Sequence, residues 1–79
     1  MKLYTSPTCG KCKVIKKLLE EKNISFEELD TSEDFKAQAY LASIGRMALP
    51  VVVRDDGSVM SENLSEIMKE INQLWLLME

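Results

Sequence analysis

Residues 2–22 read KLYTSPTCGKCKVIKKLLEEK and contain both cysteines of the 79-residue chain, Cys9 and Cys12. The first four of these residues are β-prone, and the Ser-Pro pair after them marks a loop. Apolar positions then recur at spacings of three and four through residues 9–22, which predicts an amphipathic helix. Thr8 is the expected N-cap of this helix. The cysteines therefore lie where a strand and loop pass into a helix.

The rest of the chain contains further alternating and periodic segments. Thr31 or Ser32 is expected to cap the second helix, and Asn63 with Glu66 is expected to form a capping box at the start of the last helix. An Asp-Gly turn predicts a hairpin between the third and fourth strands. The expected elements are a strand at residues 25–30, a helix at 33–44, strands at 51–53 and 59–61, and a helix after residue 63.

This order of elements predicts an α/β fold. The first two strands must be parallel because a helix joins them, and such crossovers are right-handed. The last two strands form an antiparallel hairpin. The sequence therefore predicts a mixed four-stranded sheet in the order β-α-β-α-β-β-α, within a single domain over residues 1–79. That arrangement matches a minimal thioredoxin fold.

Composition narrows the function classes. Hydrophobic residues make up 46% of the chain and charged residues 29%, as in ordinary globular proteins. The formal net charge of −3 and the lack of a basic run argue against nucleic-acid binding. No apolar stretch is long enough to cross a membrane, and no signal peptide is evident at the N-terminus. We therefore expect a cytoplasmic protein, in a compartment where paired cysteines are more often redox-active or metal-binding than structural.

The motif CGKC at residues 9–12 predicts redox chemistry because of its place at a helix N-terminus. Unpaired backbone N–H groups and the positive end of the helix dipole favour a thiolate there, so the pKa of the Cys9 thiol is expected to be low. Cys12 lies one turn further on and is expected to be more buried. Cys9 is the predicted attacking thiol and Cys12 the resolving thiol. Lys11 and Lys13 add positive charge that favours the thiolate.

Other uses of the cysteine pair remain open from the residues alone. A structural disulfide across so short a loop would constrain the unfolded chain little. A closed zinc site normally takes four ligands, and the chain has no histidine and no third cysteine. The main alternative function is an iron–sulfur cluster shared by two chains, with Cys9 of each chain and two external thiols as ligands.

The Leu49-Pro50 pair directly precedes the predicted strand at residues 51–53. A proline is tolerated at the first residue of a strand because it need not donate to the ladder. One interpretation is a simple loop proline. The other is a cis-proline that faces the cysteines and leaves the backbone of Leu49 free to pair with an extended substrate. X-Pro bonds are cis in only about 5–6% of cases, and the cysteine motif upstream favours the second interpretation.

The segments YTSPTCGKC at residues 4–12 and LPVVV at residues 49–53, with the helix that follows them, resemble the glutaredoxin family and its relatives, the redoxins that reduce ribonucleotide reductase. The resemblance extends over nearly the whole chain. It implies a dithiol–disulfide oxidoreductase that needs no bound cofactor or metal. By this resemblance Cys9 is the nucleophile and Pro50 the cis-proline.

The same resemblance implies a surface that holds a thiol peptide. Thr8 and Lys11 would lie beside the active site, and the backbone of Leu49 would hold the peptide. Glutaredoxins commonly carry Gly-Gly and then an acidic residue before the last helix, where they bind glutathione. This chain has Ser61 and Glu62 in that place, and Met60 is expected to crowd it. The sequence also has Gly-Lys between the cysteines, where glutaredoxins usually have an aromatic residue.

The expected partners follow from the resemblance. The substrates would be protein or mixed disulfides, including that of ribonucleotide reductase. Either glutathione or a thioredoxin reductase would supply the electrons. The chain is expected to act as a monomer, although the apolar end WLLM at residues 75–78 suggests a contact surface. A third interpretation is therefore an interaction module that uses this end to bind a partner.

Overall fold

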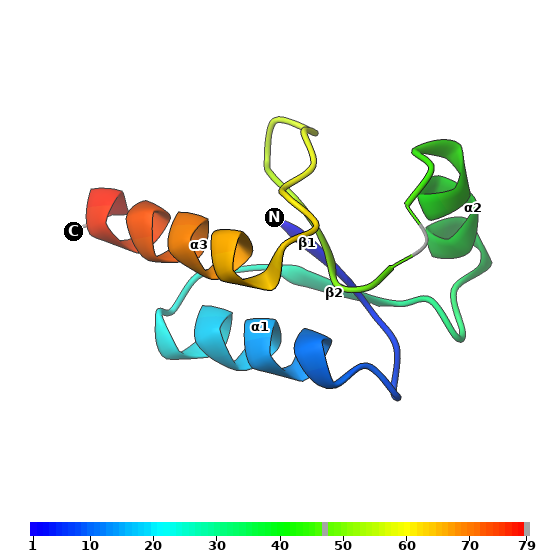
Figure 1. Cartoon of the computed structure of the whole chain (residues 1–79), viewed down its shortest axis with the longest axis horizontal. Coiled ribbons are helices and arrows are strands. Elements are labelled where there is room, and N and C mark those ends of the chain that lie inside the picture. The colour runs from blue at the N-terminus through cyan, green and yellow to red at the C-terminus, as the bar shows by residue number, and fades with distance from the viewer. Residues whose placement is uncertain (47, 79) are drawn as a thin grey trace.

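The computed structural model of the chain describes residues 1–46 and 48–78 (Figure 1). Met47, Glu79 and the side chain of Met78 lie outside the described residues. The elements are β1 (Lys2–Thr5), α1 (Gly10–Glu21), β2 (Glu27–Asp30), α2 (Phe35–Ser43), β3 (Val51–Val53) and α3 (Leu64–Met78).

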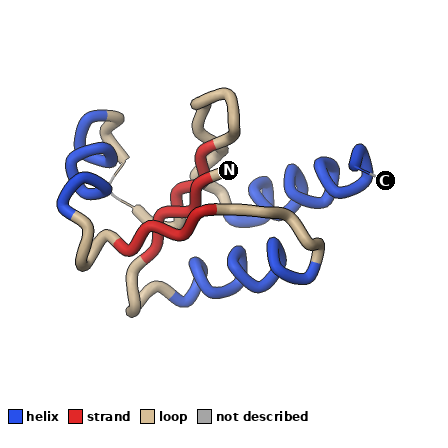
Figure 2. The backbone as a smooth tube through the Cα atoms, turned by 180° about the vertical axis from the view of Figure 1, so that it is seen from behind, coloured by secondary structure: helices blue, strands red, loops and turns tan. Residues whose placement is uncertain are grey.

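The sheet has the strand order β2-β1-β3, so β1 is the central strand. β1 pairs with β2 in parallel and with β3 antiparallel, which confirms the mixed sheet. In the register, Lys2 lies opposite Glu27 of β2 and Val53 of β3. The three strands lie side by side in the middle of the molecule, and helices pack around them, as Figure 2 shows.

The expected fourth strand at residues 59–61 is wrong, because the sheet of the described residues has three strands. Val59 forms only an isolated antiparallel bridge with Val53. Two residues later, the hydroxyl oxygen of Ser61 accepts a hydrogen bond of 3.1 Å from the backbone N–H of Asn63. The chain thus turns towards α3 before a ladder can extend.

The hydrophobic residues divide into two cores, one on each face of the sheet. Successive strand residues point to opposite faces, so Val52 joins one core while Val51 and Val53 join the other. The first core lies under α1 and α3, which contact each other; its buried members are Leu3, Ile15, Leu19, Ile24, Val52, Met60, Ile67 and Ile71. The second lies under α2 and consists of Tyr4, Ala37, Leu41, Val51 and Val53.

The N-cap of α2 is Asp34 rather than Thr31 or Ser32. Its carboxylate accepts hydrogen bonds of 2.9 and 3.2 Å from two backbone N–H groups in the first turn. The two expected caps are engaged elsewhere. The Thr31 hydroxyl donates to the carbonyl of Thr5, and the Ser32 hydroxyl donates to the carboxylate of Asp30. Asp34 is therefore the residue left to satisfy the helix start.

α3 is fixed at its start and along its length. The side-chain oxygen of Asn63 accepts a hydrogen bond of 2.9 Å from the first turn, as expected of a cap. The N–H of Asn63 donates to Ser61 instead of Glu66, so the expected capping box is wrong. Further along, Arg54 of the hairpin pairs with Glu70 through two bonds of 2.5 and 2.6 Å. Within the described residues, no helix is long and apolar enough to cross a membrane.

Candidate functional site

Cys9 is the N-cap of α1, and the expectation that Thr8 would fill this position is wrong. The Sγ atom of Cys9 accepts a hydrogen bond of 3.1 Å from the backbone N–H of Cys12. Thr8 is exposed, and its hydroxyl lies 3.4 Å from that of Ser6. Because the N–H of Cys9 already donates to the Ser6 carbonyl in a turn, the helix begins one residue later than predicted. The sulfur of Cys9 thus lies at the end where helix N–H groups are unpaired.

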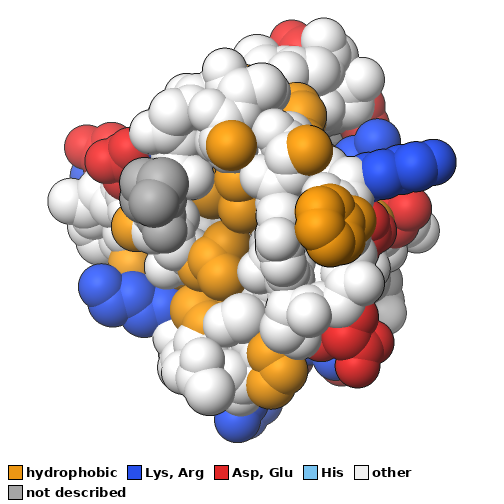
Figure 3. Space-filling view, turned by 90° about the vertical axis from the view of Figure 1, so that its right-hand side faces the viewer, with side chains coloured by type: hydrophobic (Ala, Val, Ile, Leu, Met, Phe, Trp, Pro, Cys, Tyr) orange, Lys and Arg blue, Asp and Glu red, His pale blue; other side chains and the backbone are white. Residues whose placement is uncertain are grey.

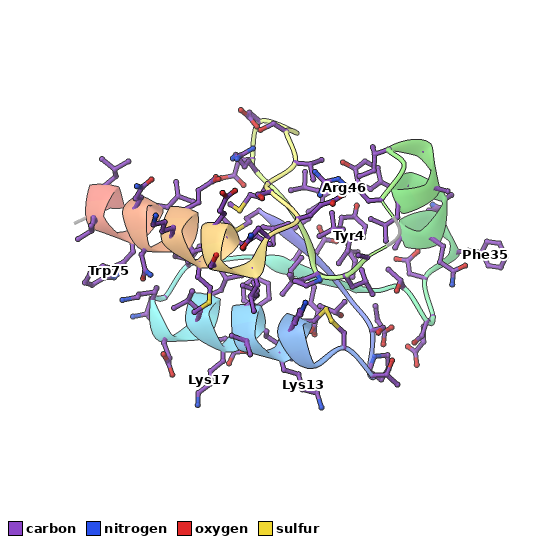
Figure 4. All side chains as sticks on the ribbon, viewed as in Figure 1. Tyr4, Lys13, Lys17, Phe35, Arg46 and Trp75 are labelled. Carbon is purple, nitrogen blue, oxygen red and sulfur yellow. A yellow bond between two sulfur atoms is a disulfide. The ribbon has the colours of Figure 1, made fainter. Side chains whose placement is uncertain are left out.

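Cys9 and Cys12 are joined by a disulfide, with their Cα atoms 5.3 Å apart. The bond is visible in yellow at the start of α1 in Figure 4. The two residues differ in burial, since Cys12 is 2% exposed while Cys9 is half-buried. The Cys12 sulfur lies 3.9 Å from the backbone carbonyl of Tyr4, to which a reduced thiol can donate. Cys9 is therefore the more exposed residue of the pair.

Lysine side chains surround the start of α1. Lys11 and Lys13 are exposed, and Lys16 pairs with Glu28 of β2 at 3.2 Å. A cavity of about 260 Å³ lies between α1 and β2 and reaches the buried Cys12; its lining is Thr5, Ser6, Pro7, Cys12, Lys13, Lys16, Glu28 and Asp30. The redox pair thus has solvent-accessible polar surroundings on the β2 side.

The Leu49–Pro50 peptide bond is cis. Pro50 is buried, and Leu49 is half-buried against the core under α2. Tyr4, near the end of β1, lies opposite Val51, the first residue of β3. The loop that leads to Cys9 and the segment that ends in Pro50 therefore leave the sheet at the same edge.

Ser61 and Glu62 lie in the loop before α3, and both are already engaged within the chain. Ser61 accepts the hydrogen bond from Asn63 described above. Glu62 pairs with Arg46 at 3.3 Å, and Arg46 also donates to the backbone carbonyl of Met60 at 3.3 Å. Arg46, which is labelled in Figure 4, thus joins the loop after α2 to the loop before α3. A single arginine after Gly45 gives no sequence signal of this contact.

Met60 does not crowd this surface. Its side chain is 1% exposed and packs in the core under α1 and α3. The backbone of Met60 donates to the carbonyl of Val52 over 2.9 Å, which fixes the direction of the side chain. The expectation of a methionine that obstructs ligands is wrong, because the pairing with β3 turns the side chain inward.

The apolar C-terminal end lies far from the redox pair (Figure 1). The ammonium group of Lys22 lies 4.1 Å from the centre of the Trp75 ring. Leu76 and Leu77 are 63% and 84% exposed. The use of this end as a contact surface stays a prediction.

The comparisons with known proteins agree with this geometry. A glutaredoxin family model matches residues 1–59, which include both cysteines and the cis-proline. The chain belongs to the glutaredoxin family. As a member of this family, with a closed Cys9–Cys12 pair, it is a thiol–disulfide oxidoreductase. Ser61 and Glu62 lie beyond the matched residues.

Relatives of similar length are known. The chain is 32% identical over 74 residues to an uncharacterized glutaredoxin-like 8.6 kDa protein of Clostridium pasteurianum, covering 92% of this chain and 99% of that protein. It is 31% identical over 67 residues to the glutaredoxin-like protein NrdH of Lactococcus lactis, covering 85% of this chain and 93% of that protein.

Solved structures confirm the thioredoxin fold of this glutaredoxin-family chain. The thioredoxin-like protein BC3987 superposes with a TM-score of 0.76 at 30% identity, over 89% of this chain and 96% of that one. The glutaredoxin-like NrdH-redoxin of Escherichia coli, described as having a thioredoxin-like activity profile, gives a TM-score of 0.76 at 27% identity. That match covers 92% of this chain and 91% of the other.

Proposed function

We propose that this chain reduces protein and mixed disulfides by a two-thiol mechanism. The Cys9 thiolate attacks one sulfur of the substrate disulfide and releases the other as a thiol, which leaves a mixed disulfide on Cys9. Cys12 then loses its proton and attacks the Cys9 sulfur, so that the substrate leaves as its second thiol. The products are two substrate thiols and the Cys9–Cys12 disulfide. The unequal burial of the two sulfurs supports this order.

The helix N-terminus supports Cys9 as the attacking group. A thiolate at its Sγ would keep the hydrogen bond of 3.1 Å from the Cys12 N–H, and a bond to a charged acceptor is stronger than a bond to a neutral one. The helix dipole and the exposed Lys11 and Lys13 act in the same direction. Each of these favours the thiolate form of Cys9 over the thiol.

A thioredoxin reductase is the electron donor in this proposal. Glutathione held at Ser61 and Glu62 would have to compete with the contacts that these side chains make to Asn63 and Arg46. The thioredoxin-like activity profile of the Escherichia coli NrdH-redoxin also supports a donor of this kind. The resemblance to redoxins that serve ribonucleotide reductase makes that enzyme the first protein substrate to test.

The test compares two cysteine variants in a disulfide-reduction assay with NADPH and thioredoxin reductase. Cys9→Ser should lose all activity. Cys12→Ser should form a mixed disulfide with the substrate, one per chain, that is visible by mass spectrometry. An active Cys9→Ser protein would refute the assignment of the nucleophile.

A second assay separates the electron donors. Glutathione with glutathione reductase should give little turnover, while thioredoxin reductase should support it. Activity with glutathione alone would overturn the choice of donor and leave the two-thiol mechanism intact. Inactivity with both donors, together with visible absorption in protein purified without oxygen, would instead favour the iron–sulfur cluster shared by two chains.

A further inference from the structure

Phe35, the first residue of α2, is 86% exposed. In Figure 4 its ring points away from the ribbon at one end of the molecule. Single exposed apolar residues are common and carry little meaning alone. Phe35, however, borders a hollow that leads towards the redox pair.

The hollow lies between β2 and the start of α2. It has a volume of about 530 Å³, and its lining is Glu28, Leu29, Asp30, Glu33, Asp34, Phe35 and Lys36. Glu28 and Asp30 also line the neighbouring cavity that reaches Cys12. The two hollows adjoin at Glu28 and Asp30 of the edge strand β2, and together we call them the β2–α2 groove; its lining extends from Cys12 to Phe35.

The outer half of the β2–α2 groove is acidic. Its lining includes four carboxylates, from Glu28, Asp30, Glu33 and Asp34, and one lysine, Lys36. Glu28 is paired with a lysine of α1, whereas Glu33 is exposed beside Phe35. Figure 3 faces this end of the molecule and shows acidic side chains beside apolar ones at the surface. A partner that covers Phe35 must therefore also face negative charge.

We propose that the β2–α2 groove docks a positively charged polypeptide segment of the substrate protein. An apolar side chain of that segment covers Phe35, while its lysine or arginine residues face Glu33 and the neighbouring carboxylates. The disulfide next to the segment then lies at the Cys12 end of the groove, beside the Cys9–Cys12 pair. This inference rests on the disulfide-reductase function proposed above and adds the chemistry by which a protein substrate is selected.

Charge complementarity determines the choice of occupant. Complementary charges across an interface raise the rate of encounter and exclude partners of like charge. The whole chain has a formal net charge of −3, so a cationic segment is attracted at long range as well as in the outer half of the groove. The exposed ring of Phe35 also offers a large apolar area for a side chain of the partner to cover.

The experiment compares three substrates in a single turnover of the pre-reduced protein. Two are synthetic peptides of equal length, each with one cysteine joined to 2-mercaptoethanol as a mixed disulfide. One peptide carries lysine and leucine residues, and the other carries glutamate and leucine residues. The third substrate is the small uncharged hydroxyethyl disulfide. The measured quantity is the second-order rate constant for thiol release; in each case the Cys9–Cys12 disulfide forms as the substrate is reduced to two thiols.

The cationic peptide should react roughly tenfold faster than the anionic one, because several exposed charge pairs of modest strength act together. This ratio should fall at high salt. Glu33→Lys and Phe35→Ser should each lower the rate with the cationic peptide and leave hydroxyethyl disulfide unaffected. The matched control for charge, Glu20→Lys on α1, should leave the ratio unchanged.

The outcomes separate the docking site from the underlying activity. Equal rates with both peptides, while hydroxyethyl disulfide is still reduced, would overturn the docking site alone. The same holds if Glu20→Lys lowers the ratio as much as Glu33→Lys does. Failure of the wild-type protein with hydroxyethyl disulfide would overturn the proposed function and the docking site together.

Discussion

Replacing Arg54 and Glu70, singly and together, tests how firmly the hairpin is held to α3. The guanidinium of Arg54 donates two bonds of 2.5 and 2.6 Å to the carboxylate of Glu70. It also donates to the Ser58 hydroxyl at 3.0 Å and to the Val59 carbonyl at 3.2 Å. The hydrogen bonding to Glu70 raises the pKa of Arg54 above its ordinary value. One side chain thus ties the turn to the last helix.

The size of the effect follows from the geometry and the burial. Two unit charges about 4 Å apart attract by about 4 kcal/mol at an effective dielectric constant near 20. The side chains of Arg54 and Glu70 are 34% and 28% exposed, so desolvation and lost side-chain freedom offset much of this attraction. Exposed pairs contribute about 0.2–1 kcal/mol. A bidentate, partly buried pair is stronger, and we expect a coupling free energy of about 1–2 kcal/mol.

The assay is urea unfolding of the wild type, Arg54→Ala, Glu70→Ala and the double variant. The coupling free energy is the amount by which the two single losses fail to add. Arg54→Ala should be the more destabilising single change, because it also removes the bonds to Ser58 and Val59. A coupling free energy below about 0.3 kcal/mol, within the usual error of additivity, would refute the conclusion that this pair fastens the hairpin to α3.

Three further predictions concern single residues. Met60→Ala should cost about 2–5 kcal/mol in urea unfolding because the side chain is 1% exposed, whereas Met60→Leu should cost under about 1.5 kcal/mol. Asp34→Ala should cost about 0.5–2 kcal/mol by loss of the α2 cap, and Asp34→Asn should retain most of that stability. Burial, and then Tyr40, raise the pKa of Tyr4 above 10.0. The folded state therefore favours the neutral phenol of Tyr4. The resulting contribution to the free energy of unfolding is present below pH 10 and is lost as the pH rises through the raised pKa. The free energy of unfolding should consequently fall more steeply above about pH 10 in the wild type than in Tyr4→Phe; equal slopes would contradict this.

Local sequence signals predicted most of the fold. The helical spacing after Cys9 and the β-prone run Val51–Val53 gave the correct elements, since each depends on a few neighbouring residues. Asn23 has a φ of 56°, as expected of a residue that tolerates the left-handed conformation at a helix exit. Errors appeared at the helix starts, where several residues compete to cap. Cys9 rather than Thr8 is the N-cap of α1, because the turn at Ser6 shifted the helix start by one residue.

The sequence by itself determined the chemistry of this protein: two cysteines three residues apart at a helix N-terminus, and a proline at the start of a strand. Both features depend only on residues that are close together in the sequence. Tertiary structure alone decided three other features of the fold. It reduced the fourth strand to a bridge at Val59, turned Met60 inward and joined Arg46 to Glu62. These outcomes depend on which segments lie side by side after folding, because strand pairing sets the direction of each side chain and brings distant charges within reach.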